Sequence, residues 1–288
     1  MDNPSTFLFH RPEFIFRDPG SQILTFQNQA ASISFSKIGN SLVSLDKSPF
    51  GSFNVQSEAS QHQIMDLLTE VEKSCRAQGI VNLTIRCFPE VYSPKKSDLI
   101  EKALREFGFA EKYKDISQVI HVSEEVMSLN VHKKRRIRKA TELGFHFIEI
   151  AEDNLSEAYT LFVESRESKG YPVSMTLDDL RGMFKRFRKE YLLFGVFDKK
   201  KMIAASVCIK INEKILYCFY IGDHLPYRTE SPVTLLIAGV YDYCRENDFE
   251  LLDLGLSTDK GTLNRGLYAY KKTFGSIDSH KLTFEKKL

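Results

Sequence analysis

The chain has 288 residues, of which 42% are apolar and 27% charged, so it is long enough for one large domain or two smaller ones with hydrophobic cores. No apolar stretch reaches the roughly 18 residues that a membrane-spanning helix needs, and residues 1–14 lack the basic start and long apolar run of a signal peptide. We therefore expect a soluble, cytoplasmic protein. The net charge of +2 does not by itself indicate a partner.

The cysteines indicate a reducing environment. Cys75, Cys87, Cys208, Cys218 and Cys244 are odd in number, and no two of them have the CxxC spacing. Three lie in apolar stretches, so we expect reduced and mostly buried thiols. No histidine and cysteine cluster has the spacing of metal ligands, and we expect no metal site.

The first half of the chain is rich in strand patterns. Five strands are predicted, at residues 22–26, 31–37, 40–46, 81–88 and 116–122. Gly39 and Asn40 suit the turn of a hairpin. One helix is predicted over residues 60–78, where apolar residues recur every three to four positions before Gly79. A second helix is predicted from Ser97 to the residues before Gly108.

The second half opens with a helix predicted over residues 128–143. Strands follow at residues 145–150, 191–198, 202–212, 215–222, 249–256 and 279–286, and tight turns join the three from 191 to 222 as an antiparallel meander. Asn154, with Glu157 as the partner of a capping box, and Thr176 are predicted to cap two helices. Ser231 is predicted to cap a third, with Pro232 at its first position.

The order of elements after residue 128 predicts an α/β fold. A long helix lies between the strands at 215–222 and 249–256, which implies a crossover and a parallel pair inside a mostly antiparallel sheet. The first half repeats part of this order, including a short helix that ends in Phe-Gly at Phe107 and Phe274. We predict two related domains, an abbreviated one at residues 1–127 and a second at 128–288. A single continuous sheet is the alternative.

Four stretches stand out in this order: the basic HKKRRIRKATELGF, the meander at residues 195–222, the helix SPVTLLIAGVYDYCREND, and DLGLS followed by GLYAYKKTFGS. Together they resemble the GNAT (N-acetyltransferase-like) superfamily. Their order and spacing look most like the double-domain branch, which includes the Fem-type aminoacyltransferases of peptidoglycan synthesis. The resemblance covers most of residues 128–288 and, more loosely, residues 20–125. It implies tandem GNAT-like domains and transfer of an acyl or aminoacyl group to an amine acceptor.

One departure from the superfamily concerns the donor. Members that use acetyl-CoA place a Gly-rich turn before the helix that follows the fourth strand, where backbone N–H groups hold the pyrophosphate. Here that place reads YIGDHLPYRTESPV, with Gly222 as its one glycine and the acidic Asp223 and Glu230 beside it. Fem-type relatives also lack this turn, because they take their aminoacyl group from charged tRNA. The donor is therefore open between acyl-CoA and aminoacyl-tRNA, and no cofactor is certain.

The segment from residue 253 to 276 holds the candidate catalytic residues. Leu267, Tyr270, Lys271 and Phe274 share one helical face, so Lys271 faces inward, where it either packs or stabilises a developing oxyanion. The resemblance places the Tyr270-Lys271 pair at the acyl-transfer site. It also implies a tyrosine that protonates the leaving group, for which Tyr268 and Tyr270 compete. Asp253, inside an apolar strand, is either a general base or a structural hydrogen-bond acceptor.

Further residues are candidates for binding. Substrate contacts are predicted for Ser257, Thr258 and Asp259 after the buried strand, and for His224, Tyr227 and Arg228 in the loop before Ser231. Six of the eight residues from 132 to 139 are basic, and they are candidates for binding an anion or nucleic acid, including tRNA: Lys133, Lys134, Arg135, Arg136, Arg138 and Lys139. A solvated helix that bridges the domains is the alternative for this run.

The sequence therefore predicts acyl or aminoacyl transfer to an amine, with three alternatives. The first is an acetyl-CoA-dependent N-acetyltransferase with an unusual phosphate loop. The second resembles the lysyl-phosphatidylglycerol synthases, which share a similar Leu-Gly-Leu-Ser, although this chain has no amphipathic helix suited to a membrane. The third is a non-catalytic relative that binds RNA or a protein partner through the basic run. The acceptor and the oligomeric state are not indicated.

Overall fold

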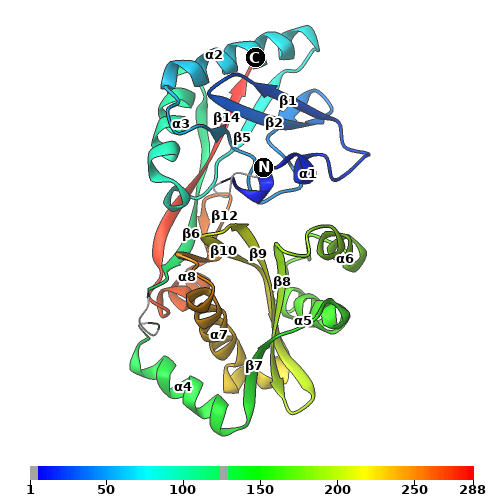
Figure 1. The fold of residues 1–288 in the computed structure, drawn as a ribbon, viewed down its shortest axis with the longest axis vertical. Coiled ribbons are helices and arrows are strands. Elements are labelled where there is room, and N and C mark those ends of the chain that lie inside the picture. Colours follow the sequence, from blue (N-terminus) through cyan, green and yellow to red (C-terminus); the bar gives the residue numbers. More distant parts are fainter. Residues whose placement is uncertain (1–5, 124–126, 128) are drawn as a thin grey trace. The chain divides into compact units, whose positions relative to one another are not determined.

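The computed structural model describes residues 6–123, 127 and 129–288, and it divides into two compact units (Figure 1). Unit 1 comprises Met1–Ser117, Leu256–Asn264 and Asp278–Leu288, and unit 2 comprises Gln118–Gly255 and Arg265–Ile277. Strand β6 (Ala110–His121) leads the chain from unit 1 into unit 2, and strand β14 (Ile277–Lys287) belongs to unit 1 again. The domain boundary predicted between residues 127 and 128 stays a prediction, since Ser128 lies outside the described residues.

Unit 1 has a mixed sheet with the strand order β1-β2-β3-β5-β14, and β4 also pairs with β2. The strands are β1 (Ile23–Gln27), β2 (Ala31–Ile38), β3 (Ser41–Val43), β4 (Asn54–Val55) and β5 (Asn82–Arg86). The β2–β3 hairpin turns at Gly39, whose φ of 57° favours glycine, so the predicted turn is confirmed. Strands β3 and β5 are parallel, and β5 and β14 are antiparallel. Strands β12 (Thr258–Asp259) and β13 (Thr262–Leu263) form a separate small hairpin.

Two longer helices pack together in unit 1. The helix predicted over residues 60–78 is confirmed as α2 (Gln61–Ala77), and it begins with a capping box between Ser60 and Gln63. Helix α3 (Pro94–Glu106) begins three residues before the predicted start at Ser97, because Pro94 fits the first helical position. The remaining helical segments are short: η1 (Leu8–His10), α1 (Pro12–Ile15) and η2 (Glu90–Tyr92).

Unit 2 has a sheet with the order β11-β10-β9-β8-β7. The strands are β7 (Phe145–Glu149), β8 (Tyr191–Asp198), β9 (Lys201–Asn212), β10 (Ile215–Asp223) and β11 (Leu251–Leu256). Neighbours from β7 to β10 pair antiparallel, whereas β10 and β11 pair parallel. Helix α7 (Pro232–Glu246) connects this parallel pair, so the predicted meander, the crossover and the mixed α/β class are confirmed.

Helices cover both faces of the unit 2 sheet (Figure 1). Helix α7 packs against one face, with α4 (Val131–Glu142) beside it, whereas α5 (Leu155–Glu167) and α6 (Leu177–Arg186) pack against the other. The remaining helical elements are η3 (Glu152–Asn154), η4 (Leu225–Glu230) and α8 (Arg265–Lys272). The residues of β9 are buried on both sides of the sheet for this reason. In the described part of the chain, none of the helices combines the length and apolarity needed to cross a bilayer.

Two predicted helix caps are wrong and one is confirmed. Thr176 and Asp179 form a capping box at the start of α6. Asn154 makes no side-chain cap, because it closes the η3 turn and donates to the carbonyl of Ala151, while Glu157 accepts from the backbone N–H of Met202. Ser231 also makes no side-chain cap, since it adopts a left-handed conformation with φ 58° between η4 and α7.

The five cysteines are free and buried, as predicted. Within residues 6–123, 127 and 129–288, no group of three or more histidine, cysteine, aspartate or glutamate side chains could hold a metal ion.

Candidate active site

The parallel pairing of β10 and β11 ends in the middle of both strands. It joins Ile215 to Leu251, Leu216 to Leu252 and Tyr217 to Asp253, while β10 continues to Asp223 and β11 to Leu256. Just beyond Tyr217, β10 also shifts register against β9 between Cys218 and Tyr220. Such an irregularity bends a strand and re-aims its side chains. The parallel pairing therefore ends at Tyr217 and Asp253, although Gly255 still lies close to β10, since a Cβ there would be 3.6 Å from the Cys218 carbonyl oxygen.

Two buried charged side chains hold Gly255 at this point. Asp253 is 1% exposed, and its Oδ1 accepts the backbone N–H of Gly255 at 2.6 Å. Lys271, from α8, is 6% exposed, and its Nζ donates to the carbonyl of Gly255 at 2.8 Å. Gly255 has φ 79°, a conformation that other residues rarely adopt. The predicted catalytic residues Asp253 and Lys271 therefore converge on one glycine.

The surroundings shift the pKa of both Lys271 and its neighbour Tyr217. Burial lowers the pKa of Lys271 to about 8, although the nearby Asp253 carboxylate opposes the shift. Burial and, next, the same carboxylate raise the pKa of Tyr217. Lys271 can thus exchange a proton near neutral pH, whereas Tyr217 stays a hydrogen-bond donor.

A second buried lysine lies beside Tyr270. Lys133 is 4% exposed, its Nζ donates to Thr234 Oγ1 at 3.3 Å, and it lies 3.9 Å from the centre of the Tyr270 ring and 4.3 Å from that of Phe274. Burial, and then the positive charge of Arg136, lower the pKa of Lys133 to about 8. Burial also raises the pKa of Tyr270 to about 12. The Tyr270 phenol therefore remains protonated in an environment shared with a cation.

Helix α8 turns only part of its predicted face inward. Lys271 and Phe274 are buried and Tyr270 is half-buried, but Leu267 is 40% exposed, because it lies in the exposed first turn of an eight-residue helix. The expectation that Leu267 packs inward is therefore wrong. Tyr268 is half-buried, and its backbone carbonyl accepts from Gln118 Nε2.

The basic run on α4 separates into one buried and five exposed side chains. Lys133 packs inside unit 2, as described above. The other five side chains are exposed: Lys134, Arg135, Arg136, Arg138 and Lys139. Arg138 lies 3.5 Å from Glu142 on the next turn. The exposed five are the part of the run that remains available to an anionic partner, and binding there remains a prediction.

The predicted binding residues after β11 lie in unit 1. Ser257 is buried, and its N–H donates to the carbonyl of Ile116. The Thr258 hydroxyl donates to Asp115 Oδ1 at 2.7 Å and accepts from the N–H of Ile116, so it anchors the β12–β13 hairpin. Asp259 is exposed.

Each predicted binding residue around η4 pairs with an acidic side chain in unit 2. His224 Nδ1 lies 3.2 Å from Glu164 Oε2. The Tyr227 hydroxyl donates to Asp198 Oδ2 at 3.1 Å. Arg228 binds Asp223 through Nε at 3.0 Å and Nη2 at 3.2 Å. These pairs fix the 3₁₀ segment in place, and contact of these residues with a substrate stays a prediction.

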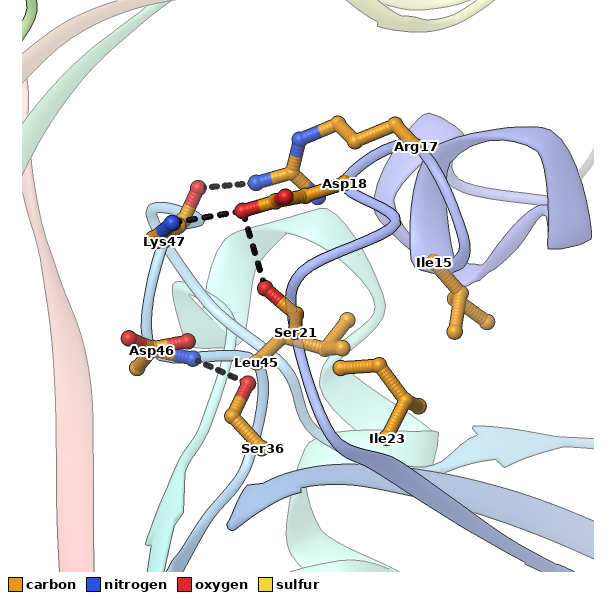
Figure 2. Close-up of a pocket in the computed structure, with 9 residues that line it drawn as sticks. All are labelled: Ile15, Arg17, Asp18, Ser21, Ile23, Ser36, Leu45, Asp46 and Lys47. Carbon is orange, nitrogen blue, oxygen red and sulfur yellow. Dashed lines mark hydrogen bonds and ion pairs between the residues drawn. The ribbon is translucent and has the colours of Figure 1, made fainter. Parts of the chain in front are cut away.

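Figure 2 shows a small cavity in unit 1, which is separate from the candidate catalytic residues of unit 2. It is lined by Ile15, Arg17, Asp18, Ser21, Ile23, Ser36, Leu45, Asp46 and Lys47. Asp18 accepts from Lys47 Nζ at 2.6 Å and from Ser21 Oγ at 2.9 Å, so the charged groups satisfy one another. The volume of about 10 Å³ has room for roughly one water molecule, which is too little for a substrate.

Sequence reasoning missed Tyr217 and the separate position of Lys133. Tyr217 joins the candidate site through its register with Asp253, and a strand pattern does not reveal which residue of a neighbouring strand lies opposite. Lys133 looked like one member of a basic run. Its neighbour Ala140, seven residues on, is also buried, and this spacing was the available signal for an inward face.

A comparison with family models matches residues 131–272 to the acetyltransferase (GNAT) domain. No curated protein matches the chain closely enough to count as a relative. A solved structure titled as FemX is similar over 99% of this chain and 94% of its own, with a TM-score of 0.74 and 12% identity.

Two further solved structures have the same fold. The C-terminal domain of a putative lysylphosphatidylglycerol synthetase from Agrobacterium fabrum has a TM-score of 0.66 at 9% identity, covering 99% of this chain and 88% of its own. A tandem GNAT protein from the clavulanic acid biosynthesis pathway has a TM-score of 0.56 at 10% identity, covering 96% and 86%. The predicted resemblance to double-domain GNAT proteins is therefore confirmed at the level of fold.

Proposed function

We propose that the chain transfers an acyl or aminoacyl group to an amine acceptor in unit 2, on the premise that residues 131–272 match the acetyltransferase (GNAT) domain. The observation that supports this most is the buried Lys271 ammonium, which donates to the Gly255 carbonyl just beyond the last paired residues of β10 and β11. A buried lysine is costly, and a structural role alone does not require its charge.

Acyl transfer to an amine has three chemical requirements. The amine must lose a proton, the carbonyl oxygen must be stabilised as it becomes an oxyanion, and the leaving group must gain a proton. We assign the stabilisation of the oxyanion to Lys271, which is protonated at pH 7 because its pKa is about 8. Asp253 is the candidate base, and its contact with Gly255 N–H also fixes the strand end.

The tyrosines are candidates for the proton donor. Tyr217 stands opposite Asp253, and its raised pKa keeps its hydroxyl protonated at neutral pH. Tyr268 and Tyr270 remain candidates from the sequence. Tyr270 is engaged by Lys133 and Phe274, and Tyr268 by Lys272, so we rank Tyr217 first.

The start of α7 favours an aminoacyl donor over acyl-CoA. A six-residue 3₁₀ segment and the left-handed Ser231 precede Pro232, in the place where a Gly-rich turn would expose N–H groups to a pyrophosphate. The N–H of Thr234 already donates to the carbonyl of Ser231. The five exposed basic residues of α4 offer nonspecific attraction to the phosphates of a tRNA.

The test is a transfer assay with two donors. Purified protein is incubated with labelled acetyl-CoA or with charged tRNA, together with a panel of primary amines, and labelled amide is quantified. We expect amide from charged tRNA and none from acetyl-CoA. Lys271→Met should lower the rate by about 100-fold or more, in the range of one lost oxyanion donor. Lys189→Met, which changes an exposed lysine elsewhere in unit 2, should leave the rate unchanged.

The outcomes separate the alternatives. Amide formed from acetyl-CoA would show that the donor is acyl-CoA and not an aminoacyl-tRNA. Equal rates for Lys271→Met and the unmodified protein would remove Lys271 from the mechanism. If neither donor yields amide while salt-sensitive tRNA binding persists, the chain is a non-catalytic relative, and the proposal fails.

A further inference from the structure

The C-terminal end of α5 meets the end of β10 in a polar cluster. Asp223, 7% exposed, accepts from Ser165 Oγ at 3.1 Å and binds Arg228 through two nitrogens. Lys169 Nζ donates to the same Ser165 hydroxyl at 3.3 Å, and Arg228 Nη2 also donates to Ser168 Oγ at 3.2 Å. Hydroxyl groups therefore link one carboxylate to two cations.

A third cation, Arg166, lies over the end of the same strand. Its guanidinium is 5.3 Å from the centre of the Tyr220 ring, and its Nη1 donates to the carbonyl of Pro172 at 3.4 Å. The Tyr220 hydroxyl is itself 2.5 Å from Ser174 Oγ, so the segment after α5 is attached to β10. The half-buried Arg166 thus has a ring and a carbonyl as neighbours.

Two cations of the cluster have no carboxylate partner. Arg228 neutralises Asp223, whereas neither Arg166 nor Lys169 forms an ion pair with a carboxylate in the part of the chain that the structure describes. Glu164, on the same helix, pairs with His224. The carbonyl end of α5 supplies only about half a negative charge. Arg166 and Lys169 are therefore two cations at this end of β10 that no carboxylate pairs with among the described residues.

The charge of Arg166 also acts on the candidate site. Tyr217 and Tyr220 lie on the same strand, three residues apart, and the charge of Arg166 opposes the rise in the pKa of Tyr217. Desolvation lowers the pKa of Lys169, Asp223 opposes this shift, and the charges of Arg228 and Arg166 add to it. The backbone of α5 approaches so closely that a Cβ at Gly222 would lie 2.6 Å from the Leu161 carbonyl oxygen. The α5 backbone is therefore packed closely against β10, with Arg166 half-buried and Lys169 exposed at its end.

We propose that Arg166 and Lys169 bind an anionic group on the amine acceptor, a carboxylate or a phosphate, and so select acidic amines over neutral ones. This inference rests on the proposed function, because it names the class of acceptor for the same unit. Arg166 offers a planar pair of donors for such a group, and Lys169 adds a second positive charge.

The experiment uses three small amines that differ in the attached group. Ethylamine has no anion, β-alanine has a carboxylate, and phosphoethanolamine has a phosphate. Binding to the full chain is measured by titration calorimetry at constant ionic strength. We expect β-alanine or phosphoethanolamine to bind at least about tenfold more tightly than ethylamine. The amine that binds more tightly shows whether the site prefers a carboxylate or a phosphate.

Two double variants test the assignment. Arg166→Gln with Lys169→Gln should abolish the preference for the acidic amine. Lys185→Gln with Arg186→Gln, at the end of α6, changes two exposed basic residues and should retain it. Circular dichroism and thermal unfolding confirm that each variant is folded.

Failure of this inference differs from failure of the proposed function. Acidic amines that bind through Arg166 and Lys169 without any amide formation would leave the inference standing and count against transfer. Amide formation that is equal for ethylamine and the acidic amines, and unchanged in the Arg166 and Lys169 double variant, would overturn the inference alone. Equal binding of all three amines would also overturn it.

Discussion

Replacing Lys271 by Met tests the electrostatics of the candidate site without needing a substrate. The methionine side chain has a similar length and no charge, so it fills the same volume in α8. The Gly255 carbonyl loses its donor, which costs about 1–3 kcal/mol at every pH. The informative quantity is how the difference in unfolding free energy between the variant and the unmodified protein changes with pH.

The sign follows from the lowered pKa of Lys271. The folded state releases this proton near pH 8, whereas the unfolded chain keeps it up to about pH 10.5. The unfolded state thus binds more protons between these values, so the contribution of Lys271 to stability rises with pH in this window. For a pKa of about 8, the rise from pH 7 to 9.5 is about 2 kcal/mol. The buried thiols have a raised pKa, so their contribution to stability falls as the pH rises. This contribution is the same in the variant and the unmodified protein, so it cancels in the difference.

The assay is urea unfolding at pH 7, 8, 9 and 9.5. The unmodified protein should gain about 2 kcal/mol relative to Lys271→Met across the range. Lys272→Met is the matched control, because that side chain is exposed, and its difference from the unmodified protein should be the same at each pH. A difference for Lys271→Met that stays constant with pH would refute the claim that Lys271 is desolvated beside Gly255.

Three further predictions concern stability and reactivity. Thr176→Ala should lower the free energy of unfolding by about 1 kcal/mol, because it removes a capping box, whereas Asn154→Ala should change it by less than about 0.5 kcal/mol; chemical denaturation of both variants checks this pair. Gly239→Ala should destabilise the protein by about 1–3 kcal/mol, because the added Cβ in α7 would lie 2.2 Å from the Phe147 ring. Gly182→Ala meets open space in α6 and should stabilise the protein by about 0.5–1 kcal/mol. Thermal unfolding measures both variants, and equal changes in the two would contradict this prediction. The five buried cysteines should react with a thiol reagent only after unfolding, and rapid reaction of the native protein would show that the thiols are accessible.

The periodicity of the sequence predicted most of the elements. Alternation and apolar runs located the meander of β8, β9 and β10, because the side-chain period of a strand is local information. The helix caps were less predictable. Thr176 and Asn154 both precede a helix with an acidic residue three positions on, but only Thr176 has the extended backbone that a cap needs. That backbone depends on the η3 turn before α5, which the local pattern does not reveal.

The candidate site divides in the same way. The sequence by itself determined that Asp253 lies inside a buried strand and that Lys271 lies on the inward face of the following helix, because strand and helix periods fix which side chains turn inward. Only the tertiary structure decided that both side chains hold Gly255, that Tyr217 stands opposite Asp253, and that Lys133 is buried against Tyr270. These contacts join residues distant in the chain, and they arise from strand register and helix packing, which depend on the whole fold.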